Sequence, residues 1–219
     1  MLEAVKIGRK AGERSLLDNI SLSLDSGQRL ALVGPSGSGK TLLLRCLAML
    51  DPMDSGEIRR LGKTVRSHEV PWFRSRIMYV PQRPSLYEGT VEQNLQQPFS
   101  LRVHRDKQFD RARIVALLKS LGRPDTFLSN QQCDLSGGEA QITALLRAVA
   151  LDPDVLLLDE PTAALDAEAT EAAEMLVGQW FNQQTNGRAT VWVTHNHEQA
   201  RRVSTSMLSI RDGRLDGEA

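Results

Sequence analysis

The chain has 219 residues, 41% of them hydrophobic and 5% aromatic, which is enough to build one globular domain with a smaller attached lobe. Its 27 basic and 27 acidic residues balance, so charge gives no indication of direct nucleic-acid binding. No apolar run approaches the roughly 20 residues that cross a bilayer, and Cys46 and Cys133 lie far apart, outside any metal-ligand pattern. We therefore expect two reduced thiols in a cytosolic protein that reaches a membrane only through a partner.

The first predicted elements lead into a glycine-rich loop. Polar and apolar residues alternate over residues 20–24, which is typical of a half-buried strand. Residues 30–33 form a short apolar run that ends at a glycine, which favours a buried parallel strand. A helix that is apolar on nearly all sides follows over residues 42–50 and is predicted to stop before Pro52. Strand, loop and buried helix are the context that a phosphate-binding loop requires.

The middle of the chain is predicted to form a second lobe. Residues 81–98 are rich in proline, glutamine and turn residues, which indicates a connector. Apolar residues then recur at helical spacing over residues 114–121, and Gly122 is placed to stop that helix. A further helix with one apolar face starts after Ser136 and ends before Pro153.

The last part of the chain returns to buried strands. Residues 155–158 and 191–193 are short apolar runs, and a long helical stretch over residues 169–181 separates them. Strands that alternate with helices, interrupted by a mainly helical insert, predict an α/β fold with a helical subdomain.

The glycine-rich loop has the composition of a phosphate cradle. It consists of Gly34, Pro35, Ser36, Gly37, Ser38, Gly39, Lys40 and Thr41. Bare glycine backbone lets successive N–H groups surround an anion, Lys40 adds a full positive charge, and Thr41 offers a hydroxyl to Mg²⁺. The alternative is a simple glycine-rich turn before a core helix, but the flanking strand and helix favour phosphate binding. Kinases, GTPases and many ATPases all remain open at this point.

Two carboxylates close the predicted strand at residues 155–158. Asp159 is placed to hold a metal ion through its water shell, and Glu160 to polarise the water that attacks a γ-phosphate. A solvated strand end would explain acidic residues, but not two together directly behind an apolar run.

A second phosphate cradle is predicted at Ser136, Gly137, Gly138 and Glu139. Ser136 and Glu139 alone would make a capping box for the helix that follows. Capping does not explain the two glycines, each of which costs up to about 1 kcal/mol in a helix relative to alanine. Bare backbone at a helix start suits close approach of an anion. Two cradles form one site if two chains meet head to tail.

With these motifs in order, the chain resembles the nucleotide-binding subunit of an ABC transporter over essentially its whole length. Residues 34–41 match the family's Walker A motif, Gln82 its Q-loop, residues 135–139 its signature motif, residues 155–160 its Walker B motif, residues 163–166 its D-loop and His195 its switch histidine. The resemblance implies a P-loop NTPase with a RecA-like core, an N-terminal antiparallel β-subdomain and an inserted helical subdomain. It places the core at residues 1–82 and 152–219, and the helical subdomain at residues 83–151.

The resemblance also implies roles for particular residues. ATP would be sandwiched between two protomers, with Gln82, Lys40, Glu160 and His195 acting in catalysis. Mg²⁺ would be held by Thr41, Gln82 and, through water, Asp159. Glu139 replaces the glutamine that is commoner in the family, although this change removes no phosphate ligand.

The partners implied by the resemblance are a second copy of the chain and an integral membrane permease, at the cytoplasmic face of the inner membrane. Residues 85–95 and 191–195 are similar to the family's iron-export branch, so iron or another metal is the first expected cargo, and phosphate or another small solute the second. Two alternatives stay open. A soluble relative in DNA repair or translation would carry coiled coils or a second fused domain, and a purely regulatory module would usually lack Glu160 or His195.

Overall fold

The computed structural model describes residues 1–184 and 187–216. These residues form two compact units. The first comprises Met1–Tyr79, Asp154–Glu160 and the described residues from 184 onward, and the second comprises Val80–Pro153 and Pro161–Gln183. Cys46 is buried and Cys133 is exposed, and both are free thiols. Among the described residues, no helix is both long enough and apolar enough to cross a membrane.

The first unit begins with an antiparallel sheet. Its strands are β1 (Leu2–Ala11), β2 (Arg14–Leu24), β4 (Ser55–Arg60) and β5 (Lys63–Thr64), in the order β2-β1-β4-β5. β1 pairs with both neighbours, so Leu2 lies opposite Leu24 on one side and Arg60 on the other. The alternation predicted over residues 20–24 is confirmed, because Ile20 and Leu24 are buried and the residues between them are more exposed.

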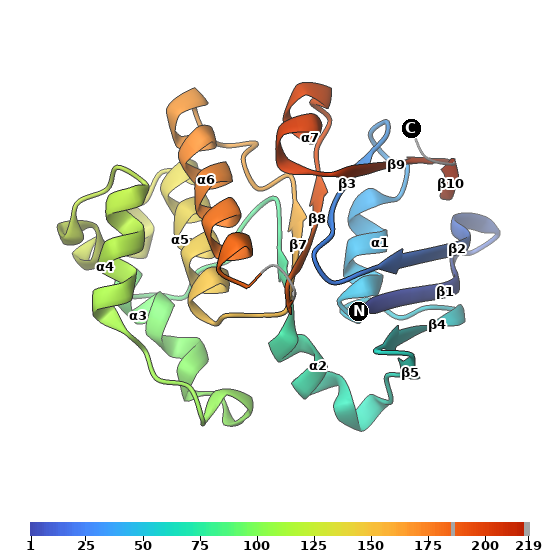
Figure 1. The fold of residues 1–219 in the computed structure, drawn as a ribbon, viewed down its shortest axis with the longest axis horizontal. Coiled ribbons are helices and arrows are strands. Elements are labelled where there is room, and N and C mark those ends of the chain that lie inside the picture. The colour runs from blue at the N-terminus through green and yellow to red at the C-terminus, as the bar shows by residue number, and fades with distance from the viewer. Residues whose placement is uncertain (185–186, 217–219) are drawn as a thin grey trace. The chain divides into compact units, whose positions relative to one another are not determined.

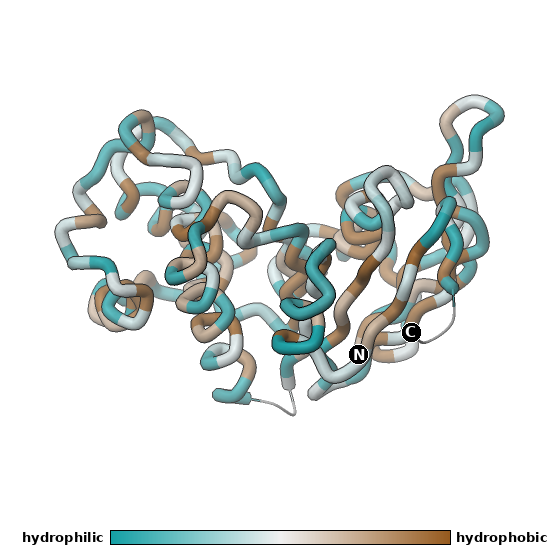
Figure 2. The backbone as a smooth tube through the Cα atoms, turned by 90° about the horizontal axis from the view of Figure 1, so that it is seen from above, coloured by the Kyte–Doolittle hydropathy of each residue, from teal (hydrophilic) through white to brown (hydrophobic). Residues whose placement is uncertain are grey.

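A six-stranded sheet forms the centre of the first unit. In the order β10-β9-β3-β8-β7-β6, its strands are Arg214–Asp216, Ser206–Arg211, Arg29–Val33, Ala189–Val193, Val155–Asp159 and Ile77–Val80. β3 runs parallel to β8 and β9, and β8 runs parallel to β7, so these strands lie side by side in Figure 1. Every residue of β7 and β8 is buried, as predicted for strands of a covered parallel sheet. Figure 2 shows brown, hydrophobic stretches along strands of this unit and teal, hydrophilic ones in its loops.

The α-helices in the described part of the first unit are α1 (Lys40–Leu47), α2 (Val70–Arg76) and α7 (His197–Val203). α1 is shorter than the predicted helix over residues 42–50. Met49 takes a left-handed φ of 54°, and the N–H of Leu50 donates to the carbonyl oxygen of Arg45. The chain therefore turns away from the helix axis before the proline at position 52.

The second unit is helical. It contains α3 (Val91–Gln96), α4 (Arg111–Ser120), α5 (Gly137–Ala150) and α6 (Ala167–Gln183). α4, α5 and α6 confirm the predicted helices, and Gly122 has a φ of 66° just after α4. The predicted connector over residues 81–98 was wrong for residues 91–96, because Thr90 and Gln93 form a capping box that starts α3. α6 packs against α5 within this unit (Figure 1).

Short 3₁₀ segments also occur among the described residues. They are η1 (Ser67–Glu69) in the first unit, and η2 (Gln97–Ser100), η3 (Arg102–His104), η4 (Asp125–Ser129) and η5 (Gln132–Asp134) in the second.

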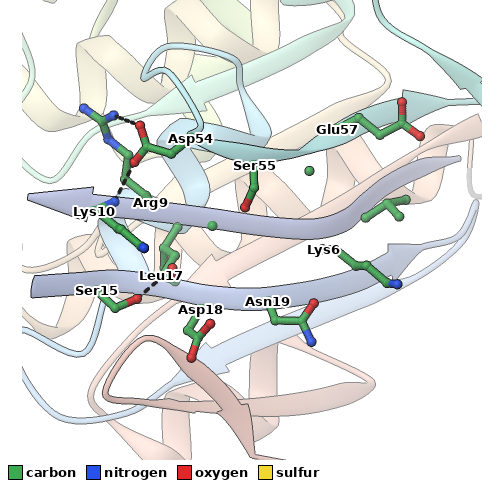
Figure 3. Close-up of a pocket in the computed structure, with 13 residues that line it drawn as sticks. Lys6, Arg9, Lys10, Ser15, Leu17, Asp18, Asn19, Asp54, Ser55 and Glu57 are labelled. Atoms are coloured by element: carbon green, nitrogen blue, oxygen red, sulfur yellow. Dashed lines mark hydrogen bonds and ion pairs between the residues drawn. The ribbon is translucent and has the colours of Figure 1, made fainter. Parts of the chain in front are cut away.

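A groove of about 710 Å³ crosses the antiparallel sheet of the first unit (Figure 3). β1, β2 and the segment that enters β4 line it, and its charges are of both signs. At one end Arg9 forms an ion pair with Asp54 at 2.9 Å, and the N–H of Lys10 donates to the same carboxylate at 2.7 Å. None of the residues predicted to bind phosphate or metal lines this groove.

Candidate functional site

The glycine-rich loop of the first unit connects β3 to α1. Gly34 and Gly39 have φ angles of 146° and 107°, which are accessible to glycine and strained for other residues. A Cβ at Gly34 would lie 2.2 Å from the carbonyl oxygen of Ile210, so no larger residue fits there. The loop is therefore held tightly against β9 while its backbone stays bare.

Lys40 lies inside this loop. Its ammonium Nζ donates to the carbonyl oxygens of Gly34 and Pro35, each at 2.8 Å, and its side chain is largely buried. Burial lowers the pKa of Lys40, although the negative charges of Glu160 and Asp159 act in the opposite direction. The hydroxyl of Ser38 is also buried, and within the described residues it has no hydrogen-bond partner. An anion that enters the loop would meet a positive charge and a hydroxyl.

Asp159, the last residue of β7, is fixed by two hydroxyl donors. Thr41 Oγ1 donates to Asp159 Oδ1 at 3.1 Å, and the phenol of Tyr79 donates to Oδ2 at 2.9 Å. Burial, followed by the charge of Asp159, raises the pKa of Tyr79, so the phenol stays protonated and remains a donor. The oxygen atoms of Thr41 and Asp159 are ligands of the kind Mg²⁺ prefers, and they lie beside the phosphate loop. These residues fit a magnesium ion.

Glu160 follows Asp159 in a strained backbone conformation. Its φ is 45°, which costs a non-glycine residue roughly 1–3 kcal/mol, and its N–H donates to the carbonyl oxygen of Val193 at 3.1 Å. The neighbouring strand β8 leads to His195, whose Nδ1 lies 3.8 Å from Glu160 Oε2. The His195 side chain is 76% exposed, whereas that of Glu160 is 22% exposed. The parallel pairing of β7 and β8 therefore brings both residues to one edge of the sheet.

The second predicted cradle begins α5 in the second unit. Ser136 and Glu139 form a complete capping box, in which the Ser136 hydroxyl donates to Glu139 Oε2 at 2.8 Å. The backbone N–H of Ser136 donates to the same oxygen at 3.0 Å, and the N–H of Glu139 donates to Ser136 Oγ at 3.3 Å. Hydrogen bonds from the backbone and then the hydroxyl of Ser136, together with the charge of Arg123, lower the pKa of Glu139. The carboxylate is ionised at neutral pH.

The two glycines of this cradle differ in how closely other atoms approach them. A Cβ at Gly138 would lie 3.1 Å from the carbonyl oxygen of Ala164, so packing alone favours glycine there. At Gly137 the nearest atom would be the Ala164 Cβ, at an ordinary 3.9 Å. Packing thus gives a second reason for glycine at position 138, whereas at Gly137 the described residues give no such reason; that both glycines admit an anion stays a prediction.

Gln82 is exposed and lies in the second unit, two residues beyond β6. The adjacent Pro81 is tied down by Gln141, a fully buried residue of α5, whose Nε2 donates to the Pro81 carbonyl oxygen at 3.2 Å. Gln141 was missed in the sequence, although a polar residue beside the apolar face of α5 was a usable signal. Tyr79 was missed as well, because nothing in its spacing connects it with Asp159.

The structure thus brings the predicted site residues together in two groups. The first unit holds residues 34–41, Asp159, Glu160 and His195, and the second unit holds Gln82 and residues 136–139.

Comparisons with known proteins identify the family of the chain. The family model described as "ABC transporter" matches residues 17–163. The probable iron export ATP-binding protein FetA of Escherichia coli strain K12 is 34% identical, with 91% of this chain and 86% of FetA covered. The L-cystine import ATP-binding protein TcyN of Bacillus subtilis strain 168 is 35% identical, with 97% and 83% covered. Among solved structures, a dimeric post-hydrolysis state of the ATP-binding cassette MJ0796 bound to ADP and Pi has a TM-score of 0.84 at 27% identity, covering 100% of this chain and 98% of that one.

The chain therefore belongs to the ABC transporter family, and the predicted P-loop NTPase fold is confirmed. Within that family it is an ATP-binding and ATP-hydrolysing subunit. Its relatives include subunits named for export and subunits named for import.

Proposed function

We propose that the chain hydrolyses MgATP in a site shared by two copies and so drives a separate membrane permease. The observation that carries this proposal is the grouping of Lys40, Thr41, Asp159, Glu160 and His195 at the ends of three adjacent parallel strands. Phosphoryl transfer to water needs mainly positioning and charge stabilisation, and these side chains supply both.

Each residue has a distinct part in the proposed reaction. Lys40 and the backbone N–H groups of residues 36–41 bind the β- and γ-phosphates. Thr41 and Asp159 would hold Mg²⁺ with Gln82, and the ion when bound would neutralise charge on the phosphate oxygens. Glu160 orients and polarises the attacking water, and His195 donates a hydrogen bond to the γ-phosphate as its charge develops.

The second phosphate cradle supports a head-to-tail dimer. Residues 136–139 would close over the nucleotide held by the partner's glycine-rich loop, because a helix start with a serine hydroxyl is suited to a terminal phosphate. The dimeric solved structures of related cassettes support this assembly.

A permease partner follows from the family, whose relatives are named as ATP-binding proteins for transport. We place the chain at the cytoplasmic face of the plasma membrane, bound peripherally to that permease. The similarity to a probable iron export protein favours iron or another metal as the cargo, whereas the cystine and sulfate import relatives favour a small solute as the second candidate. Purification of the chain from its own membranes, with identification of the co-purified integral protein, tests the partner.

The decisive experiment replaces the proposed water-activating residue. Glu160→Gln removes the carboxylate that polarises water, and we expect phosphate release to fall at least about a hundredfold. Sedimentation should still detect dimers at saturating MgATP, since no phosphate ligand is lost. Glu171→Gln, on an exposed position of α6, is the matched control and should keep the parent rate.

Two outcomes would contradict the proposal. Phosphate release unchanged in Glu160→Gln would remove the residue from the chemistry. An unaltered protein that binds ATP but releases no phosphate would instead be a regulatory module.

A further inference from the structure

Glu139 brings a negative charge to the place where the proposed site must receive a phosphate. Its carboxylate lies in the first turn of α5 and accepts the Ser136 hydroxyl at 2.8 Å. The same hydroxyl is needed for the γ-phosphate of the partner's nucleotide. Because like charges repel and the carboxylate competes for the serine, Glu139 should oppose nucleotide closure unless its charge is compensated.

Arg123 is the cation that faces this carboxylate. Its Nη1 lies 3.5 Å from Glu139 Oε1, on the oxygen that does not contact Ser136. The left-handed turn at Gly122 sets its backbone, and the N–H of Arg123 donates to the Leu118 carbonyl oxygen at 2.9 Å.

The guanidinium of Arg123 also lies over an aromatic ring. Its central carbon lies 5.9 Å from the ring centroid of Phe127, which is buried. This cation–π contact favours the conformations of the long side chain that keep its charge beside Glu139, although the Arg123 side chain is 34% exposed. Glu139, Ser136, Arg123 and Phe127 all belong to the second unit.

We propose that Arg123 is a positioning residue for phosphate binding: it neutralises the Glu139 carboxylate beside the place of the anion, so that Ser136 can be offered to the partner's nucleotide. This inference rests on the proposed function, because it concerns the shared ATP site. A merely structural alternative is that Arg123 only fastens α5 to the segment around Phe127. The two differ in whether the charge of Glu139 matters.

A double-mutant test separates them. In the Glu160→Gln background, which stops turnover, sedimentation velocity measures the ATP concentration that gives half-maximal dimer. We expect Arg123→Gln to raise this concentration about tenfold, the effect of one uncompensated charge near a phosphate. Adding Glu139→Gln should bring it back to within about twofold of the background, because the repulsive charge is gone. Arg123→Lys keeps the charge but loses the planar guanidinium and its contact with the ring, so its half-maximal ATP concentration should lie between those of the background and of Arg123→Gln.

The matched control is Arg111→Gln. Arg111 forms an ion pair of the same kind with Glu92, at 3.0 Å, on α4 of the same unit. Removing that pair should leave the half-maximal ATP concentration unchanged. Thermal unfolding of each variant reports whether the fold is retained.

The outcomes are distinguishable. If Arg123→Gln raises the half-maximal ATP concentration equally with and without the Glu139→Gln change, its role is structural and the inference is overturned. No rise at all in Arg123→Gln would also overturn it. Failure of the Glu160→Gln background itself to dimerise with ATP would contradict the proposed function, and the inference would fall with it.

Discussion

Asp159 has a carboxylate that is oriented by two hydroxyl groups of the protein. Both of its carboxylate oxygens accept hydrogen bonds, one from Thr41 and one from Tyr79, so the side chain is oriented within the protein itself. Thr41 and Asp159 were predictable because each belongs to a motif of fixed spacing. Tyr79 was not, because its phenol reaches Asp159 from a neighbouring segment 80 positions away in the sequence.

Tyr79→Phe should therefore weaken metal use without disturbing the phosphate loop. The ring remains while one donor to Asp159 is lost, so we expect the Mg²⁺ concentration for half-maximal phosphate release to rise about tenfold at saturating ATP. A magnesium titration measures this, and Mn²⁺ binding followed by electron paramagnetic resonance gives a readout independent of turnover. Tyr87→Phe, at an exposed tyrosine, is the control. An unchanged magnesium midpoint in Tyr79→Phe would show that the phenol does not orient the ligand.

The glycines at positions 137 and 138 show where reasoning from residue type reached its limit. Both were predicted to admit an anion, and at Gly138 the closeness of Ala164 also favours a residue without a side chain. The sequence shows that these positions are glycine. The reason for a glycine depends on which atoms lie where its side chain would be, and those atoms are known only from the folded chain.

At the scale of elements, the start of β7 is held by an ion-pair cluster around the largely buried carboxylate of Asp154. The Asp154 carboxylate is contacted by Arg60 Nη2 at 2.5 Å and by Arg76 Nε at 3.0 Å. Arg60 in turn stacks over Trp72 at 4.7 Å. The backbone of Asp154 also bonds to Arg76 and Ala189, so this residue sets where β7 enters the sheet.

Asp154→Ala should be among the most destabilising single changes in the first unit. It leaves two arginines without their shared carboxylate in a site where Asp154 is only 11% exposed. We expect a loss of about 3–5 kcal/mol in the free energy of unfolding, measured by urea denaturation. Asp106→Ala, at a carboxylate that is 90% exposed in a weak pair with Arg105, should change it by less than about 0.5 kcal/mol. Similar losses in the two variants would contradict the cluster's importance.

Elements with a clear apolar pattern were predicted well. The buried strands β3, β7 and β8 follow from short continuous apolar runs, and the helices α4, α5 and α6 follow from apolar residues at helical spacing. α3 was missed because its six residues are too few to establish a helical period. The early end of α1 was missed because a left-handed Met49 has no sequence signal of its own.

At the scale of the whole molecule, the phosphate-handling groups are divided between two units. Motif spacing predicted the groups themselves. It cannot identify which copy of the chain supplies each group to a given nucleotide, since the pairing of two surfaces is a property of two chains. The head-to-tail site is therefore a proposal that needs its own test.

Mixing two inactive variants tests it directly. Lys40→Ala disables the glycine-rich loop and Ser136→Arg blocks the second cradle, so each alone should release almost no phosphate. In a head-to-tail dimer an equal mixture should recover about a quarter of the parent activity, because half of the dimers contain one intact site. Lys40→Ala mixed with Glu160→Gln should recover no activity, since both residues belong to the same half of the proposed shared site and every site would then carry one of the two changes. No recovery in the first mixture would contradict a shared site.

The backbone of Glu160 has a consequence for how this chain can change over generations. A glycine would occupy its φ of 45° without strain, so replacing the glutamate would relieve the backbone strain at this position. The proposed role of Glu160 in turnover would keep the side chain in place, which would set stability and activity against each other at one position. If a copy of the gene were released from selection for ATP hydrolysis, a change from glutamate to glycine at this position would no longer be opposed by a loss of activity and would relieve the backbone strain.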